Sequence, residues 1–387
     1  MALPLSYNIR NLIVRWRVTV LAIGAIALVV AVLIVLFAMA NGFRIALQST
    51  GSIENAVLTQ RGSTGELTSG LSFDNARAVM VDDRVLRDEV GNPLASPEMF
   101  VVASLPRKDT GLATNVSLRG IKPMALRVRH GVKIVEGRMF TRGLNELIVG
   151  RKANLRYSGV DVGQTVRLQR RDWLITGVFE ANGGGFESEL WGDIDVLQPA
   201  FLRRGGYQSV TLRLKDPASV TKFHDELSKN PRMQVQLVQE RKYYDDQSVQ
   251  VSGPLMALAI FVALVMGVGA VFGAMNTMYG IVAARTREIG TLRALGFSRT
   301  AILISFVTES TMLALVGGVL GCLIAIPANG ISSAAGGANF AEVSFAFRIT
   351  TPTVIAGLVL AVLMGFAGGL LPAWRAARVP ITAALRS

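Results

Sequence analysis

The residues that could perform catalysis or bind a metal are few and scattered in this chain. The single cysteine, Cys322, lies in an apolar run, and the two histidines are His130 and His224. Because a structural zinc site uses four Cys or His ligands, these residues argue against one. No lysine follows a glycine, as a phosphate-binding Gly-Lys-Ser/Thr loop requires. We therefore predict that the chain is no enzyme and binds no cofactor or metal.

A stretch rich in acids and aromatics, residues 182–195, begins with an asparagine and three consecutive glycines. Exposed aromatic and charged side chains can form an interaction site, and carboxylates can hold a cation. The alternative, a solvated loop that leads into a strand or helix, is more common. The candidate partner-contact residues are Phe186, Glu187, Glu189, Trp191 and Asp193, with Asp195 beside them. We interpret the arginine pairs at 170–171 and 203–204 as solvated surface.

One acid interrupts an otherwise apolar stretch. Glu309 lies within residues 301–328, where an isolated carboxylate is costly to bury and must be paired or protonated. It can act as a proton site or as a polar contact that locks helix packing. We favour the packing contact, because the sequence offers no second ionisable residue inside an apolar stretch for a proton relay.

Four apolar stretches must position these side chains. They cover residues 18–40, 254–279, 301–328 and 353–371, and a bilayer crossing needs about 20 residues. The chain is 51% hydrophobic and 17% charged, which also places part of it in lipid. The first stretch can be read as a cleavable signal peptide, but it is longer than the apolar core of such a peptide. We expect it to be retained.

The positive charge marks one side of the membrane. The net charge is +13, and the segments 1–17, 280–300 and 372–387 hold ten arginines and one acid. This concentration in three short segments is typical of cytoplasmic loops. It does not resemble the basic patch of a nucleic-acid-binding protein. We therefore place both termini in the cytoplasm and predict no nucleic-acid partner.

The long segment between the first two apolar stretches has an ordinary soluble composition. Its alternating residues predict strands at 133–136, 146–149, 165–168 and 173–179, and a helix at 220–229. We expect a strand-rich lobe at about 120–195, inserted into a domain built from the flanking parts. The segments 42–54 and 240–252 are expected to continue the membrane helices as stalks.

The predicted fold class is a membrane protein with four transmembrane α-helices and a large α+β extracytoplasmic domain between the first and second. The predicted boundaries are 1–17 for the cytoplasmic N-terminus, 18–55 for the first helix and stalk, 56–239 for the periplasmic domain, 240–279 for the stalk and second helix, 280–300 for the cytoplasmic coupling segment, 301–328 for the third helix, 329–352 for an external loop, 353–371 for the fourth helix and 372–387 for the cytoplasmic C-terminus.

Glycines spaced four residues apart recur in three of the apolar stretches. The pairs are Gly269 with Gly273, Gly317 with Gly321, and Gly365 with Gly369. Glycine lets helix backbones approach closely in a membrane. We expect some pairs to pack within one chain and others to form a seam between two copies, without a sequence signal that separates the two.

A short amphipathic helix is predicted at residues 286–296. Ile289, Leu292 and Leu295 fall on one side, which can seat in a partner's groove or rest on lipid headgroups. Polar anchors flank this side, and the last glycine can end the helix. The candidate coupling residues are Thr286, Arg287, Glu288, Ile289, Gly290, Leu292, Arg293, Leu295 and Gly296.

The sequence around this helix resembles the MacB/FtsX-type permeases of ABC transporters. The resemblance rests on residues 276–278, 284–290 and 292–296, and on the C-terminal segment 372–386. Residues 135–141 and 163–178 resemble the external domain of the same family more weakly.

The resemblance implies a permease subunit of an export complex that forms a homodimer in the bacterial inner membrane, surrounded by lipid. A separate ABC ATPase subunit, which binds ATP and Mg²⁺, is implied to dock on residues 286–296. Its hydrolysis is implied to move the periplasmic domains mechanically, with a periplasmic adaptor and an outer-membrane channel as further partners. The alternative is an FtsX-like regulator that activates cell-wall hydrolases and transports nothing. The substrate is left open.

Overall fold

The computed structural model describes residues 16–336 and 342–381. These residues form two compact units. One unit contains the chain up to residue 41, residues 254–331 and the chain from 347 onward. The other contains residues 42–253 and 332–346. Arg10, Arg15 and the end of the C-terminal motif at 384–386 lie outside the described residues.

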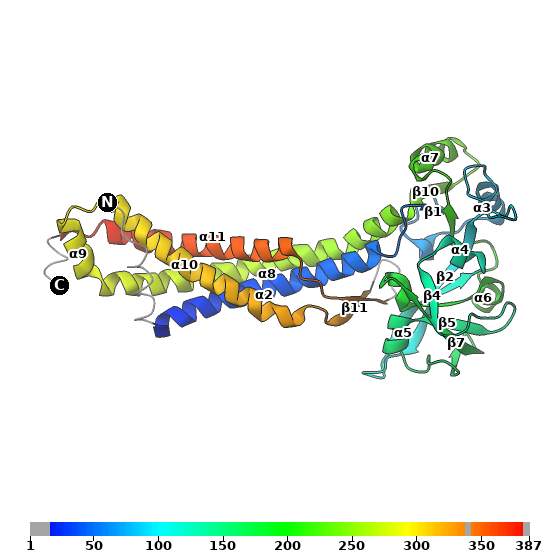
Figure 1. Ribbon diagram of the computed structural model, residues 1–387, viewed down its shortest axis with the longest axis horizontal. Coiled ribbons are helices and arrows are strands. Elements are labelled where there is room, and N and C mark those ends of the chain that lie inside the picture. Colours follow the sequence, from blue (N-terminus) through cyan, green and yellow to red (C-terminus); the bar gives the residue numbers. More distant parts are fainter. Residues whose placement is uncertain (1–15, 337–341, 382–387) are drawn as a thin grey trace. The chain divides into compact units, whose positions relative to one another are not determined.

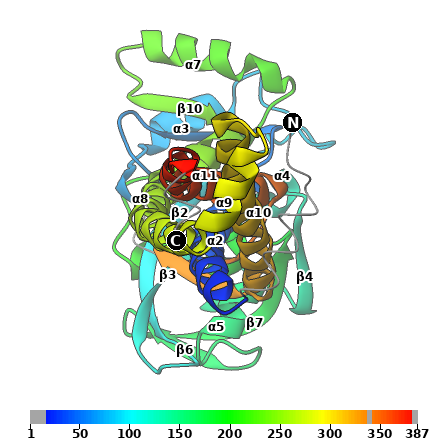
Figure 2. The same ribbon diagram turned by 90° about the vertical axis from the view of Figure 1, so that its left-hand side faces the viewer.

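Four long helices dominate the first unit and lie side by side (Figures 1 and 2). They are α2 (Trp16–Gln48), α8 (Glu240–Ala284), α10 (Arg299–Ala325) and α11 (Thr351–Ala377). Each is long and apolar enough to cross a membrane. Together with the sheet domain between the first two helices, they confirm the predicted fold class.

Small residues and branched aliphatic side chains form the interior of this helical unit. Ile26 and Val30 of α2 pack with Ala314 of α10 and Ala361 of α11. Many large apolar side chains on the same helices are exposed, for example Phe261, at 63%. An apolar outer surface is expected for helices whose surroundings are lipid, because lipid gives no hydrophobic drive to bury it.

The second unit is built around one ten-stranded mixed sheet (Figure 1). Its order is β10-β1-β9-β2-β3-β8-β5-β7-β4, with β6 paired to β7. Only β3–β8 and β5–β7 are parallel among these pairs of described strands. The strands are β1 (Asn55–Gln60), β2 (Ala95–Pro106), β3 (Ala113–Ile121), β4 (Val132–Gly137), β5 (Glu146–Gly150), β6 (Thr165–Leu168), β7 (Arg171–Ala181), β8 (Glu189–Asp193), β9 (Ser209–Arg213) and β10 (Val235–Gln239). The four predicted strands are confirmed as β4 to β7.

Two apolar cores share this sheet. One gathers around Leu58 and the other around Trp173. Strand β2 joins them, because Ala95 belongs to the first core and Met99 to the second. The expected lobe at 120–195 therefore begins too late, since β2 and β3 supply part of its core and one sheet continues through both. The helices of this unit are α3 (Phe73–Met80), α4 (Met124–Val128), α5 (Arg151–Arg156), α6 (Ile194–Ala200) and α7 (Val220–Lys229), the last being the predicted helix.

The stalk predictions are confirmed for α8 and only partly for α2. Helix α2 ends at Gln48, short of the expected residue 54. The hydroxyls of Ser49 and Thr50 donate to the Ala46 carbonyl oxygen, at 3.0 and 2.8 Å. Such side chains compete with the backbone and favour a helix end.

The segment expected as an external loop at 329–352 contains a hairpin of two antiparallel strands, β11 (Ser332–Gly336) and β12 (Glu342–Ala346). The hairpin belongs to the sheet-containing unit. The Ser344 N–H donates to Ser188 Oγ at 2.9 Å, and Arg156 forms an ion pair with Glu342 at 2.6 Å. The connection between α10 and α11 is thus attached to the domain.

Candidate functional site

The predicted amphipathic helix exists as α9 (Thr286–Ala294), at one end of the helical bundle (Figures 1 and 2). It follows α8 after a break at Arg285. Gly296 adopts φ +98°, and its N–H donates to the Arg293 carbonyl oxygen at 3.1 Å. A glycine in the left-handed region commonly ends a helix. Gly296 ends this helix, as predicted, and the last helical residue lies two positions earlier.

The predicted apolar side of α9 does not form one partner-facing surface. Ile289 is 2% exposed and packs, with the half-buried Leu292, into the chain's own core. Leu295 lies beyond the helix and is 73% exposed. The prediction of a shared free face is wrong, because the bundle end already covers two of its three side chains. The surface left open carries Arg287, Glu288 and Leu295.

The other coupling candidates lie around this surface in different environments. Thr286 donates its hydroxyl to the Ala283 carbonyl oxygen at 2.9 Å, and Gly290 is buried beside Ile289. Arg293 is half-buried, and its Nε atom has no hydrogen-bond partner within the described ranges. These residues therefore shape α9 more than they extend its open surface.

Glu309 has an ion-pair partner that the sequence did not suggest. Its carboxylate lies 3.0 Å from Arg285 Nη1, and both side chains are almost fully buried. Arg285 Nε also reaches Glu288 Oε2 at 3.2 Å, and the guanidinium lies 5.2 Å from the Phe306 ring centre. The preferred interpretation, a polar packing contact, agrees with this geometry. Arg285 thereby links the start of α9 to α10.

Two of the three glycine pairs are packed against neighbouring helices of the same chain. A Cβ atom built at Gly321 would lie 2.6 Å from the Ala27 carbonyl oxygen of α2, and Gly317 faces the same helix. Gly365 and Gly369 face α10 in the same way. Atoms so close leave no room for a side chain, so these four glycines serve packing within one chain.

The pair on α8 is different. Within the described part of the chain, no atom outside the local helix backbone lies within 4 Å of a Cβ built at Gly269 or Gly273. The neighbouring Val268 and Phe272 are 56% and 64% exposed. This face of α8 is therefore open in a single chain.

Residues 184–194 of the stretch 182–195 are buried, so the predicted alternatives, an exposed partner contact and a solvated loop, are both wrong for them. The stretch forms a short 3-10 turn (Gly185–Ser188), strand β8 and the start of α6. Glu187 accepts hydrogen bonds from the N–H groups of Ala181 and Gly183, at 2.9 and 2.7 Å. Asp193 caps α6 by accepting from the Asp195 N–H at 3.0 Å. These acids therefore satisfy local backbone donors. The arginines at 170–171 and 203–204 are exposed, as predicted.

The remaining residues of that stretch join a buried charge network that the sequence did not reveal. Arg119 of β3 contacts Glu66 at 2.6 Å, Glu98 at 2.7 Å and Glu189 at 2.8 Å. The indole N–H of Trp191 donates to Glu189 Oε2 at 2.7 Å. Burial raises the pKa of Glu66, but pairing with Arg119 outweighs it and holds that pKa below its usual range.

The network continues through Arg129, which follows α4, to the first residue of α8. Arg129 forms ion pairs with Glu98 and Glu240 and donates to Thr211 Oγ1 at 2.8 Å. Glu240 Oε2 accepts from the Ser52 N–H and from Asn55 Nδ2, both at 3.0 Å. The pairing partners are far apart in sequence, so no local pattern predicts the network.

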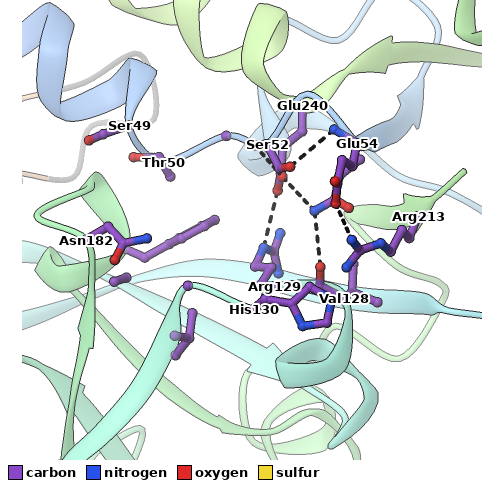
Figure 3. A pocket seen from close by; sticks show the side chains of 16 residues that line it. Ser49, Thr50, Ser52, Glu54, Val128, Arg129, His130, Asn182, Arg213 and Glu240 are labelled. Carbon is purple, nitrogen blue, oxygen red and sulfur yellow. Dashed lines mark hydrogen bonds and ion pairs between the residues drawn. The ribbon is translucent and has the colours of Figure 1, made fainter. Parts of the chain in front are cut away.

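A cavity of about 280 Å³ opens beside this end of the network (Figure 3). Arg129 and Glu240 line it, together with His130, Asn182 and the ion pair of Arg213 with Glu54. Figure 3 shows the Arg129–Glu240 pair next to Ser52, where the chain leaves α2. The cavity thus lies beside the residue at which α8 begins.

Comparison with known families gives two matches that together cover most of the chain. Residues 19–230 match the MacB-like periplasmic core domain, and residues 260–381 match the FtsX-like permease C-terminal region. The first match alone covers more than half of the 387 residues.

Curated relatives align with this chain over different shares of its length. The macrolide export ATP-binding/permease protein MacB of Nitrobacter winogradskyi is 26% identical, over 95% of this chain and 58% of its own length. The pyoverdine export ATP-binding/permease protein PvdT of Pseudomonas entomophila is 38% identical, over 34% of this chain and 18% of its own. The chain spans about half the length of the curated relatives that it matches most fully.

The solved periplasmic region of MacB from Actinobacillus actinomycetemcomitans aligns with a TM-score of 0.38 at 13% identity. It covers 53% of this chain and 96% of that one.

Proposed function

The chain belongs to the MacB/FtsX family of ABC transporter permeases, and from this premise we propose that it is the membrane subunit of an export complex. A separate ATPase subunit supplies the ATP hydrolysis and holds ATP and Mg²⁺. The proposal places both termini and α9 in the cytoplasm of a bacterial cell, the helices in the inner membrane and the sheet domain outside it, as the arginine distribution favours.

The observation that carries the proposal is the surface of α9. Arg287, Glu288 and Leu295 are open at the end of the bundle, while Ile289 anchors the helix in the chain's own core. An exposed leucine flanked by charges suits docking into a groove of a partner protein. Arg285 connects this surface to Glu309 of α10 through a buried ion pair. A push on α9 therefore reaches the membrane helices directly.

Movement of the helices then drives the external domain, which acts on a substrate already outside the membrane. A second copy of the chain completes the complex, and a periplasmic adaptor and outer-membrane channel extend it. Relatives are named for macrolide and for pyoverdine export, and neither substrate is assigned to this chain. The match of residues 19–230 to a MacB-like core supports export over the alternative of a hydrolase regulator.

The test is purification of the native complex through a tag on this chain, with mass spectrometry and an ATPase assay. We expect an ATP-hydrolysing subunit to co-purify with the wild type and to be lost in Leu295→Asp. Leu155→Asp, at a position of α5 that is 69% exposed, is the control and should retain it. Glu288→Lys should leave the protein inserted in the membrane but uncouple hydrolysis from export. A complex without any nucleotide-hydrolysing subunit would contradict the proposal.

A further inference from the structure

We propose that Glu240 and Arg129 are positioning residues that fix the first turn of α8 to the centre of the sheet, so that residues 240–253 of α8 and the sheet move as one body. The inference rests on the proposed function, in which α8 carries movement to the external domain. It assigns to two buried side chains the joint through which that movement passes.

Glu240 makes the central contacts of this joint. It is the first residue of α8 and only 1% exposed. One carboxylate oxygen accepts from the Ser52 N–H, beyond the end of α2, and from Asn55 of β1. The other accepts from Arg129 Nε at 3.3 Å. A single side chain therefore ties the start of α8 to the end of α2 and to the sheet.

Arg129 carries the connection into the middle of the sheet. Its guanidinium contacts Glu98 of β2 and Thr211 of β9, two adjacent strands. Glu98 also binds Arg119 of β3, the next strand in the order. The first turn of α8 is thus connected to four neighbouring strands, β1, β9, β2 and β3, by side chains that have little freedom.

The chemistry of the joint favours orientation over stability. Charges lose their hydration on burial, and a buried ion pair is often no more stabilising than apolar residues of the same size. Apolar contacts are non-directional, whereas charge-assisted hydrogen bonds fix both distance and angle. A joint that transmits movement needs this fixed distance and angle.

Aromatic packing also supports the first turn of α8. Tyr243 and Tyr244 are buried, and the Tyr244 ring meets the edge of Phe186 with centroids 5.7 Å apart. Phe186 lies 4.6 Å from the Arg129 guanidinium, which places the aromatic group and the ion pair in one assembly.

The network also contains a natural control. Glu189 binds Arg119 through two oxygens, as Glu240 binds Arg129 through one, and both acids are buried. Glu189 lies on β8, and its ion pair with Arg119 and its hydrogen bond from Trp191 both stay within the sheet. Glu189→Gln therefore weakens the network as Glu240→Gln does, without touching the joint.

The test is a distance measurement by pulsed electron paramagnetic resonance on the full chain in lipid nanodiscs. Spin labels are attached at Val249→Cys on α8 and Leu174→Cys on β7, which are 50% and 37% exposed. Cys322→Ser removes the native thiol, and dilution with unlabelled protein suppresses distances between copies. Neither the ATPase nor the substrate is needed, so failure of the export proposal does not affect the readout.

The expected result is a narrow distance distribution in the wild type and in Glu189→Gln, and a broadened or shifted one in Glu240→Gln. Both variants should lower the thermal unfolding temperature, because both remove a buried charge partner. An unchanged distribution in folded Glu240→Gln overturns the proposal, and so does equal broadening in Glu189→Gln. If Glu240→Gln does not fold, Glu240→Asp, which keeps the charge but shortens its reach, is measured under the same criteria.

Discussion

The packing of the membrane helices predicts opposite effects for two glycine-to-alanine changes. In Gly321→Ala the new methyl group would lie 2.6 Å from the Ala27 carbonyl oxygen and 2.8 Å from Val30 Cβ. Backbone atoms cannot move aside as a flexible side chain can, so the helices must separate. Such overpacking costs about 1–3 kcal/mol. Replacing glycine within a helix returns about 0.5–1 kcal/mol. The net expectation is a destabilisation near the middle of the range of about 0–2.5 kcal/mol that these two effects give.

Gly24→Ala is the matched control, because no atom of the described chain outside its own helix backbone lies within 4 Å of the added methyl group. This variant should be stabilised by about 0.5–1 kcal/mol through the helix term alone. The assay is reversible unfolding of the purified chain in mixed micelles with increasing dodecyl sulfate. Equal effects of the two changes, or a stabilised Gly321→Ala, would refute the packing described here.

Two further predictions concern charged groups. Glu309→Gln should destabilise the chain by about 3 kcal/mol. This is the lower end for breaking a buried ion pair, because Arg285 retains Glu288 as an exposed partner. Replacing both Glu309 and Arg285 by Met should restore most of that loss in the same unfolding assay. In the sheet domain, hydrogen bonds from Arg138 lower the pKa of Glu146 to about 2, from an ordinary value of 4.5. A depressed pKa stabilises the fold above the unfolded value and loses that stabilisation as pH falls from about 4.5 to 2. As pH falls through that range, the thermal unfolding temperature of the wild type should therefore decrease more steeply than that of Glu146→Gln. Parallel decreases in the two proteins would contradict a lowered pKa of Glu146.

The elements of the fold were predictable wherever a single segment carried its own signal. Apolar length identified four membrane helices, and alternation identified strands such as β6, because burial on one face imposes period two on the sequence. The predicted lobe boundary was wrong because β2 contributes to both cores. Pairing between strands that are far apart in the sequence leaves no pattern in either segment. The hairpin at β11 and β12 was missed for a related reason: Ser344 is held by Ser188, which lies 156 positions earlier.

For the candidate sites too, the sequence predicted the features that a local pattern carries and missed those that depend on distant residues. The motif around α9 located the helix and its terminating Gly296, but it did not indicate that Ile289 packs inside the chain. Phe186 and Trp191 were expected on the surface because acids surround them in sequence. Those acids instead accept hydrogen bonds from backbone N–H groups and from Arg119, and the aromatic residues are buried with them. Composition reveals the presence of charge, and only the fold reveals its partner.

The central claim is that an ATPase subunit acts on this chain through the open surface of α9. A cysteine placed by Leu295→Cys in a Cys322→Ser background tests it in intact membranes, with a short bifunctional crosslinker and mass spectrometry. The account predicts a crosslink to a nucleotide-hydrolysing protein and protection of the thiol from a membrane-impermeant maleimide added outside the cell. Rapid labelling from outside, with no crosslink to such a protein, would contradict it.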